Sequence, residues 1–200
     1  FGIKFKNRIH EQISESLKSL NVNILRVNAQ IMHDGYNPNL VDQKAKQERN
    51  IPLLKQMIND EPNFYYWPYN LAISYMAIEE NDLALKYLND SYNEDLNINI
   101  KAAILNLIGG VYKNEGLWEN IKEPVQKSVK MVKKQFLGHI LLSEYYSNNE
   151  NYKKAISSLD AIIDSYEYLT KNGSDLNYDL NYNLNHIKKI KGIYLHQQGD

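Results

Sequence analysis

One helix-pair pattern recurs three times between Pro62 and Ile162, and it constrains the fold more than any other feature of the chain. In each copy a small residue precedes a tyrosine by three positions. An alanine or isoleucine follows the tyrosine, and a second aliphatic residue lies four positions further on. The successive tyrosines are 37 and 34 residues apart, a period typical of stacked helical hairpins. The copies are Ala72, Tyr75, Ala84 and Leu88; Gly109, Tyr112, Ile121 and Val125; and Ser143, Tyr146, Ala155 and Leu159.

Packing explains why this pattern needs these residue types. The small residue lets the second helix of a hairpin approach the first, the tyrosine fills the groove between them, and the later aliphatic residues seat the return helix. Such a hairpin cannot bury its apolar face alone, so it needs neighbours. In the second copy Pro124 falls inside the return helix. Because proline costs about 3 kcal/mol in a helix interior, we expect that helix to restart near Glu123.

The pattern resembles the tetratricopeptide repeat, most closely in the third copy, from Tyr146 to Ala155. The resemblance implies a mainly α, tetratricopeptide-like α-α superhelix, right-handed, for residues 62–200. After a helix stop at Asn172 to Asp175, Gly192 and Leu195 resemble the first half of a fourth repeat. We therefore expect about three and a half hairpins.

Composition excludes several other classes of protein. The formal net charge is −1, so no overall field attracts nucleic acid or an anionic membrane, and we expect no nucleic-acid partner. No apolar run has the length of a membrane span. The chain has no cysteine, which excludes disulfides and thiolate metal sites and favours a cytoplasmic location.

Residues 1–36 differ from the repeats. Phe1–Phe5 and Ile24–Ile31 alternate apolar and polar residues, so both are candidate strands, a short β remnant at the N-terminus. Two strands alone are marginal in water and need a sheet to join. Turn residues at 34–38 then lead into residues 37–61, a predicted connecting helix. Because the chain begins at Phe1 without a methionine, we expect it to be a piece of a longer protein.

Several short motifs in this region occur in a consistent order. They are Arg8 to Glu11, Ile31 to Tyr36, Lys44 to Ile51 with Leu53 and Leu54, and Glu61 to Asn63 before the first repeat. Together they resemble the carboxyl end of a bacterial family 2 glycosyltransferase, including the peptide S-glycosyltransferases. The resemblance covers roughly residues 1–92 and implies that residues 1–36 are the terminal strands of a GT-A catalytic domain.

The same resemblance implies the chemistry of a parent protein. A GT-A enzyme uses a nucleotide-sugar donor and an Asp-x-Asp motif that holds Mg²⁺ or Mn²⁺ against the diphosphate. Residues 1–36 are too few for the nucleotide-binding unit, so we expect this segment to have no catalytic residue and no cofactor of its own.

The resemblance makes His10 a candidate metal ligand in the parent, with Glu11 and His33 as candidate binding residues. The alternative is that His10 and Glu11 only fix a strand end and that His33 only packs at the end of a strand. Tyr65, Tyr66, Trp67 and Tyr69 open the first repeat, where aromatic faces would form a binding rim for a sugar or peptide. The alternative for these four is that they seal the first helix of the solenoid.

Two functions follow from these features. The leading prediction is the non-catalytic repeat domain of a family 2 glycosyltransferase. It would bind a protein or peptide acceptor, or form a homo-oligomer through the repeats, next to the transferase domain. The alternative is a stand-alone tetratricopeptide-repeat adaptor without enzymatic activity. A peptide-sensing regulator ranks below both, because no segment resembles a DNA-reading helix pair.

Overall fold

A computed structural model describes residues 4–9, 11–20, 25, 42–172, 176 and 183–199. The described chain is almost wholly helical, which confirms the mainly α helical-repeat class. It contains no strand, and its only β pairing is an isolated antiparallel bridge between Lys6 and Gln12. Most of the two candidate strands, Phe1–Phe5 and Ile24–Ile31, lies outside the described residues. The chain divides into two compact units, Phe1–Ser91 and Tyr92–Asp200, which are described separately.

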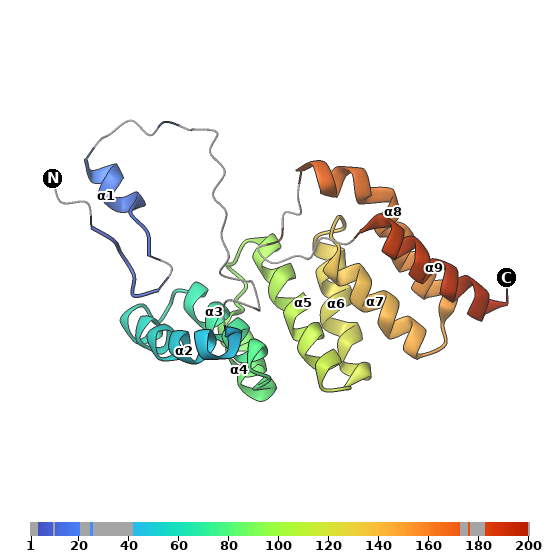
Figure 1. The fold of residues 1–200 in the computed structure, drawn as a ribbon, viewed down its shortest axis with the longest axis horizontal. Coiled ribbons are helices and arrows are strands. Elements are labelled where there is room, and N and C mark those ends of the chain that lie inside the picture. Colours follow the sequence, from blue (N-terminus) through green and yellow to red (C-terminus); the bar gives the residue numbers. More distant parts are fainter. Residues whose placement is uncertain are drawn as a thin grey trace. The chain divides into compact units, whose positions relative to one another are not determined.

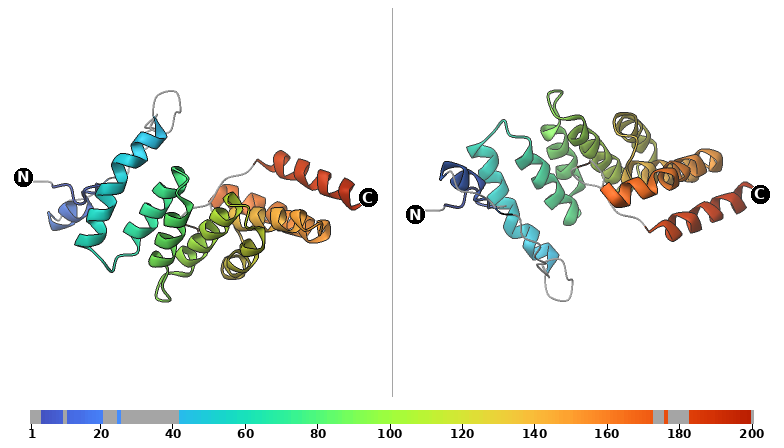
Figure 2. Two further views of the ribbon diagram at one scale, coloured as in Figure 1. Left: turned by 90° about the horizontal axis from the view of Figure 1, so that it is seen from below. Right: turned by 90° about the horizontal axis from the view of Figure 1, so that it is seen from above.

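The first unit contains four helices within its described residues: α1 (Ser14–Ser19), α2 (Gln43–Asp60), α3 (Tyr66–Ala77) and α4 (Asn81–Ser91). Asp42 is the N-cap of helix α2, and its side chain accepts a hydrogen bond from the Ala45 backbone N–H at 3.1 Å. Consecutive helices pack on one another, α2 on α3 and α3 on α4 (Figures 1 and 2). Their buried core includes Leu54, Met57, Trp67, Leu71, Ala72, Ala84 and Leu88.

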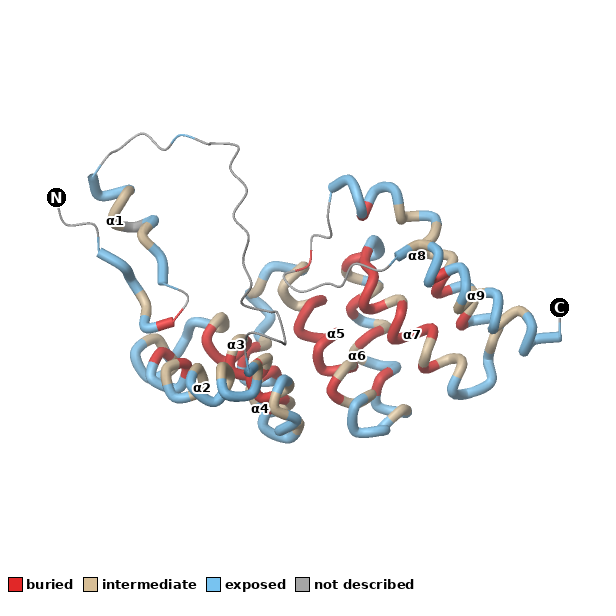
Figure 3. Tube along the Cα trace, in the orientation of Figure 1, coloured by how far each residue is buried: buried red, intermediate tan, exposed pale blue. Residues whose placement is uncertain are grey.

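The second unit contains five helices within its described residues: α5 (Ile98–Asn114), α6 (Trp118–Met131), α7 (Leu137–Asn148), α8 (Tyr152–Asn172) and α9 (Leu184–Gln198). Each helix packs against the next, and α5 also contacts α7. The buried residues of this unit concentrate on α5, α6 and α7 and on the facing side of α8 (Figure 3). None of the described helices in either unit combines the length and apolar character that a membrane span requires.

The helix boundaries agree with the repeat pattern. The three sequence copies form the pairs α3–α4, α5–α6 and α7–α8. At the small position Ala72 and Ser143 are buried, and a Cβ built on Gly109 would overlap Cγ2 of Val125. The residues that seat the return helices have no exposed surface: Ala84, Leu88, Ile121, Val125, Ala155 and Leu159. The small residue therefore sets the close approach of each hairpin.

The tyrosines of the pattern are less uniform than the sequence predicts. Tyr75 is buried at 5% exposure, whereas Tyr112 and Tyr146 are half-buried against the core of the second unit. The hydroxyl of Tyr146 accepts a hydrogen bond from Nε2 of Gln126 at 2.8 Å, so this ring lies at the edge of the hairpin. Only the first copy has a fully inserted tyrosine.

The expected restart of the second return helix is wrong. Helix α6 runs from Trp118 to Met131 without interruption and contains Pro124. Proline removes one N–H, which would otherwise bond the carbonyl of Asn120, but its ring lies on a half-buried face. On either side of it Ile121 and Val125 have no exposed surface, and this burial holds both halves of the helix in register.

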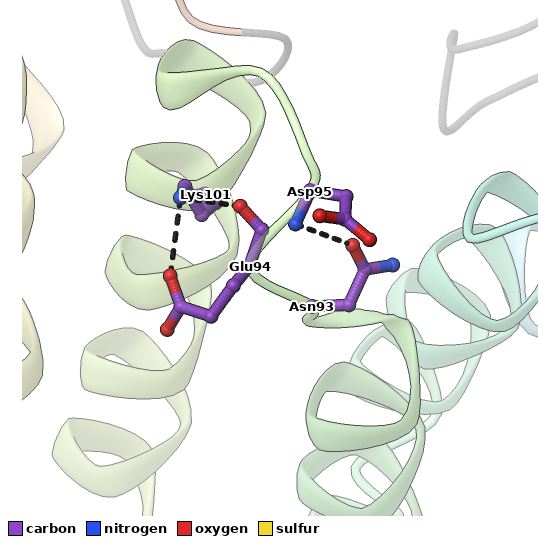
Figure 4. A network of polar contacts seen from close by, with 4 residues as sticks. All are labelled: Asn93, Glu94, Asp95 and Lys101. Atoms are coloured by element: carbon purple, nitrogen blue, oxygen red, sulfur yellow. Dashed lines mark hydrogen bonds and ion pairs between the residues drawn. The ribbon is translucent and has the colours of Figure 1, made fainter.

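Polar contacts fix the start of the second unit (Figure 4). The ammonium of Lys101 donates to the backbone carbonyl of Glu94 at 2.9 Å and to its carboxylate at 3.2 Å. The backbone N–H of Asp95 donates to the side-chain oxygen of Asn93 at 3.1 Å. The Asn97 side chain then accepts from the backbone N–H of Asn99 at 2.8 Å as the N-cap of α5. These bonds set where α5 begins.

Candidate functional site

A cavity of about 440 Å³ lies in the first unit, between the N-terminal segment and the corner that joins α2 to α3. We call it the corner cavity. Its N-terminal wall consists of Lys6, Asn7, Gln12 and Ser14, and its helical wall consists of Glu61, Phe64, Tyr66 and Trp67. The two walls are about fifty residues apart in the sequence, so the cavity exists only in the folded chain.

The N-terminal wall is a closed loop. Lys6 and Gln12 exchange backbone hydrogen bonds of 2.8 and 3.0 Å, and Asn7 between them has a positive φ of 74°. Asparagine is one of the few residues besides glycine that adopts this conformation readily. The Ser16 hydroxyl donates to the Lys4 carbonyl at 2.7 Å and accepts from its N–H at 3.1 Å, which ties α1 to the same loop.

An ion pair joins this loop to the end of α2. The guanidinium of Arg8 donates from Nε to the Asp60 carboxylate at 3.2 Å, and the neighbouring Ile9 is buried at 8% exposure. Both charged side chains are about half exposed, so the ion pair contributes little, about 0–1 kcal/mol. It serves mainly to orient the loop.

The helical wall is a continuous aromatic cluster. The Phe64 ring lies 5.6, 5.8 and 5.8 Å from the centroids of Tyr65, Tyr66 and Trp67. Tyr66 and Trp67 meet at 5.1 Å with an interplanar angle of 71°, an edge-to-face arrangement. Phe64 keeps 45% of its surface exposed whereas Trp67 keeps 1%. The cluster thus has a buried anchor and an exposed aromatic rim.

Glu61 lines the cavity and also holds the buried Trp67 side chain in place. Its Oε2 accepts a hydrogen bond from the Trp67 indole N–H at 2.7 Å. The bond satisfies the only polar atom of the buried indole and holds the carboxylate at the cavity wall. The backbone N–H of Glu61 caps α2 by donating to the Met57 carbonyl at 2.9 Å, so Glu61 is fixed at both ends.

The sequence-predicted site residues are distributed as follows. Tyr66 and Trp67 line the corner cavity, and Tyr65 belongs to the same aromatic cluster without lining the cavity. Tyr69 is buried at 4% exposure in the core, and Glu11 is exposed on the loop beside Gln12. His10 and His33 lie outside the described residues. The metal and binding roles of these residues remain predictions.

Sequence reasoning missed most of the cavity. It did not single out Lys6, Asn7, Gln12, Ser14 or Phe64, and it named Glu61 only as part of a motif before the first repeat. Phe64 precedes three other aromatic residues, and this run was a usable signal. The polar residues of the loop carry no motif, so only the tertiary structure identifies them.

The groups of the cavity are suited to binding a small ligand. Its polar groups are two side-chain amides, the hydroxyls of Ser14 and Tyr66, an ammonium and a carboxylate, and its apolar groups are aromatic. Within the described part of the chain no group of three or more His, Asp or Glu side chains is placed to hold a metal ion. The donors and acceptors around an aromatic wall fit a small polar molecule with an apolar face.

A second, shallower surface runs along α6 in the other unit. It mixes acidic and basic side chains, Glu119, Lys122, Glu123, Gln126, Lys127 and Lys130. The Lys127 ammonium lies 5.1 Å from the ring centroid of Tyr92, and the hydrogen bond to Tyr92 raises the pKa of Lys127. The alternating charges resemble an ordinary solvated helix face and point to no particular ligand.

Comparisons with known proteins bear on the function. No family model matches the chain. Over 91 residues it is 32% identical to the SPbeta prophage-derived glycosyltransferase SunS of Bacillus subtilis strain 168 and to the glycosyltransferase SunS of Bacillus phage SPbeta. The match covers 46% of this chain and 21% of each relative, so the chain spans about a fifth of the length of the curated relatives it matches.

Solved structures show the fold class. A crystal structure of MamA aligns with a TM-score of 0.54 at 15% identity, over 85% of this chain and 97% of that chain. A second MamA crystal structure aligns with the same score and identity over 78% and 85% of the two chains. MamA is a tetratricopeptide-like helical repeat protein. At this identity the likeness shows that the chain has a helical-repeat fold.

Proposed function

We propose that this chain is the repeat domain of a family 2 glycosyltransferase of the GT-A type. The domain is not catalytic by itself. It holds a protein or peptide acceptor, or a sister subunit, next to a nucleotide-sugar transferase domain. The observation that carries the proposal is the 32% identity to a glycosyltransferase over 91 residues, together with the ordered motifs in residues 8–63.

In this proposal the chain and the rest of the parent protein have different roles. Residues 1–36 are too short for a nucleotide-binding unit, so the donor site belongs to another part of the parent protein. That part would supply the Asp-x-Asp motif with Mg²⁺ or Mn²⁺. In this proposal His10 approaches the metal or the diphosphate, and Glu11 and His33 bind nearby. The parent acts in the cytoplasm, in keeping with a chain that has no cysteine.

The helical repeats supply the binding surface. Within each unit the helices pack mainly on their neighbours in sequence, and helical repeats of this kind leave a surface that suits an extended acceptor or a second copy. Ion pairs between helices stiffen this surface in the second unit: Lys113 on α5 pairs with Glu144 on α7, and Lys191 on α9 pairs with Asp160 on α8, each at 2.6 Å. A stiff surface loses less conformational entropy when it binds.

A stand-alone repeat adaptor is the second candidate. The helical-repeat fold suits it equally well, and one MamA chain aligns with this chain over 97% of its length. In that case residues 4–20 would act only as a cap on the aromatic end of α3.

The reading frame that encodes the chain separates the two candidates. We expect sequencing upstream of Phe1 to reveal alternating strands and helices that end in an Asp-x-Asp motif. The purified parent should then transfer sugar from a nucleotide donor, and His10→Ala should lower transfer while leaving its melting temperature nearly unchanged. A frame that opens within a few residues of Phe1 would contradict the glycosyltransferase proposal and favour the adaptor.

A further inference from the structure

We propose that the corner cavity is a carbohydrate site that takes one pyranose ring of a glycoside. Phe64 and Tyr66 provide the apolar wall for the ring face, and Asn7, Gln12 and Glu61 bind its hydroxyl groups. The inference deepens the proposed function and rests on it for the origin of the sugar, which is either a nucleotide-sugar donor or a glycosylated acceptor. Both sources present the same pyranoside chemistry.

The dimensions of the cavity fit a ligand of this size. Its volume of about 440 Å³ lies within the range of roughly 300–1,000 Å³ found for small-molecule sites. The described residues contain no strand whose edge could pair with an extended peptide. The cavity therefore matches a compact ligand better than a peptide strand.

The aromatic wall can stack on a ligand ring, because part of it is exposed and only part of it is packed inside the protein. Trp67 is buried and held by its bond to Glu61, whereas Phe64 keeps 45% of its surface exposed and Tyr66 is half-buried. The Phe64 and Tyr66 rings are tilted by 34° with centroids 5.8 Å apart, so together they form one continuous apolar surface. A pyranose ring has a face of C–H groups that such a surface desolvates favourably.

The polar wall offers both donors and acceptors. The Ser14 hydroxyl donates to Oε1 of Gln12 at 3.4 Å, so the Gln12 amide presents its NH₂ group as a donor. Asn7 adds a second amide. Oε2 of Glu61 accepts from Trp67, and Oε1 is the oxygen that accepts from a ligand hydroxyl. Sugar hydroxyls donate and accept at once, and this mixture of groups serves both roles.

The charges of the cavity favour a neutral ligand. Lys6 contributes a positive charge and Glu61 a negative one. The two charges have opposite signs and cancel overall, so the cavity offers neither an anion nor a cation a net electrostatic attraction. A polyhydroxylated ring is not penalised by either charge, because charged groups also form the stronger hydrogen bonds with hydroxyls.

The loop that carries the polar wall is preorganised. The paired backbone bonds between Lys6 and Gln12, the bonds from Ser16 to Lys4 and the burial of Ile9 fix its conformation before any ligand enters. Less ordering entropy is then lost on binding.

The chain contains its own reporter for this site. It has two tryptophans, Trp67 in the cavity wall and Trp118 in α6. In a Trp118→Phe background all tryptophan emission comes from Trp67. We expect the methyl glycoside of at least one of glucose, galactose, mannose or N-acetylglucosamine to change this emission saturably, with a dissociation constant of about 1 mM. Saturation-transfer NMR should show the C–H face of the same glycoside in contact with the protein.

Variants test the two walls separately. Phe64→Ala should weaken binding at least about tenfold, since it removes the exposed part of the aromatic wall. Its matched control is Phe5→Ala, an exposed phenylalanine outside the cavity at 73% exposure, which should bind like the parent chain. Asn7→Gly keeps the positive φ and removes only the amide, so it should weaken binding about threefold to tenfold with an unchanged helical circular dichroism spectrum.

The outcomes separate the ligand classes and the two proposals. If a nucleotide sugar binds like its methyl glycoside and the nucleotide alone does not bind, the site takes the sugar of the donor. If a glycosylated peptide binds more tightly than its unglycosylated form, the site takes the sugar of the glycosylated acceptor. A response to the unglycosylated peptide alone, or to none of the four glycosides, overturns the inference. Because binding is measured on this chain without a transferase domain, it can succeed or fail whatever lies upstream of Phe1.

Discussion

The Asn106 side chain on α5 donates a hydrogen bond from Nδ2 to Oε1 of Gln135 at 2.6 Å, and neither residue has any exposed surface. Nε2 of Gln135 donates to the Val132 carbonyl and to the Ser128 hydroxyl, the latter at 3.3 Å. Ser128 donates in turn to the Ala102 carbonyl at 2.9 Å. This buried network joins α5, α6 and the connection to α7, and buried polar groups of this kind stabilise only while they are paired.

Gln135→Ala should therefore destabilise the chain. It leaves the Asn106 amide and the Ser128 hydroxyl with fewer partners in a site closed to solvent, at a cost of about 1–3 kcal/mol. Urea unfolding followed by circular dichroism measures the change. Gln197→Ala, at an exposed position near the end of α9, is the matched control and should leave the midpoint unchanged. An equal midpoint for the two variants would contradict a structural role for the network.

The adjacent glycines of α5 should respond in opposite ways to the same substitution. A methyl group at Gly109 would overlap Cγ2 of Val125, so Gly109→Ala should cost about 1–3 kcal/mol of the free energy of unfolding. At Gly110 nothing lies within 4 Å of the added Cβ, so Gly110→Ala should stabilise the helix by about 0.5–1 kcal/mol. Thermal melts of the two variants make the comparison. A stabilising Gly109→Ala would refute the close approach of α5 and α6.

The first and second repeat tyrosines should differ in their contributions to stability. Tyr75 is buried and stacks on Tyr87, with centroids 5.6 Å apart and an interplanar angle of 10°. Tyr75→Ala should cost about 3–5 kcal/mol, as for a buried aromatic residue. Tyr112 is half-buried, so Tyr112→Ala should cost roughly half as much. Denaturant titrations of both variants test the order, and a larger cost at Tyr112 would contradict the burial pattern.

Alkaline pH should weaken one contact in the first unit. The Lys55 ammonium lies 5.8 Å from the Tyr75 ring centroid, and a hydrogen bond and coulombic attraction to Tyr75 raise the pKa of Lys55 above 10.5. A raised folded-state pKa means that the charged form stabilises the fold. This contribution is complete below the pKa of Lys55 in the unfolded chain, about 10.4, and is lost as pH rises through the pKa of Lys55 in the folded chain.

The stability difference between the parent chain and Lys55→Gln should therefore be constant from neutral pH to about pH 10 and shrink above it. The effect is small because Lys55 is exposed. Lys55→Arg is the control, since arginine keeps its charge in this range and should not show the decline. Chemical denaturation at several pH values measures both, and a difference that grows with pH would have the wrong sign.

Much of the helical architecture follows from sequence alone. The spacing of Ala72, Gly109 and Ser143 relative to the return-helix residues predicts the three hairpins, and the structure places helix pairs there. This works because the contacts within a hairpin are local: a small residue and an aliphatic partner about sixteen residues later must meet whenever both segments are helical. Because these contacts are local, the helical-repeat class can be predicted from the sequence although no family model matches it.

The repeat pattern alone does not predict how deeply each side chain is buried. Pro124 sits within a continuous α6 because Ile121 and Val125 are anchored on both sides, and helix propensity does not record such anchoring. Likewise Tyr75 and Tyr112 occupy the same repeat position yet differ in burial, since neighbouring helices decide how deep each ring lies.

The candidate site is a product of tertiary structure. The aromatic run at residues 64–67 marks one wall, but the other wall is an unremarkable polar loop about fifty residues earlier. The contact of Arg8 with Asp60 links the two segments. By itself the sequence determined the repeating hairpins, because short-range spacing fixes them. Only the tertiary structure decided the cavity and the Asn106–Gln135 network, because both depend on side chains that approach across long stretches of chain and leave no periodic trace.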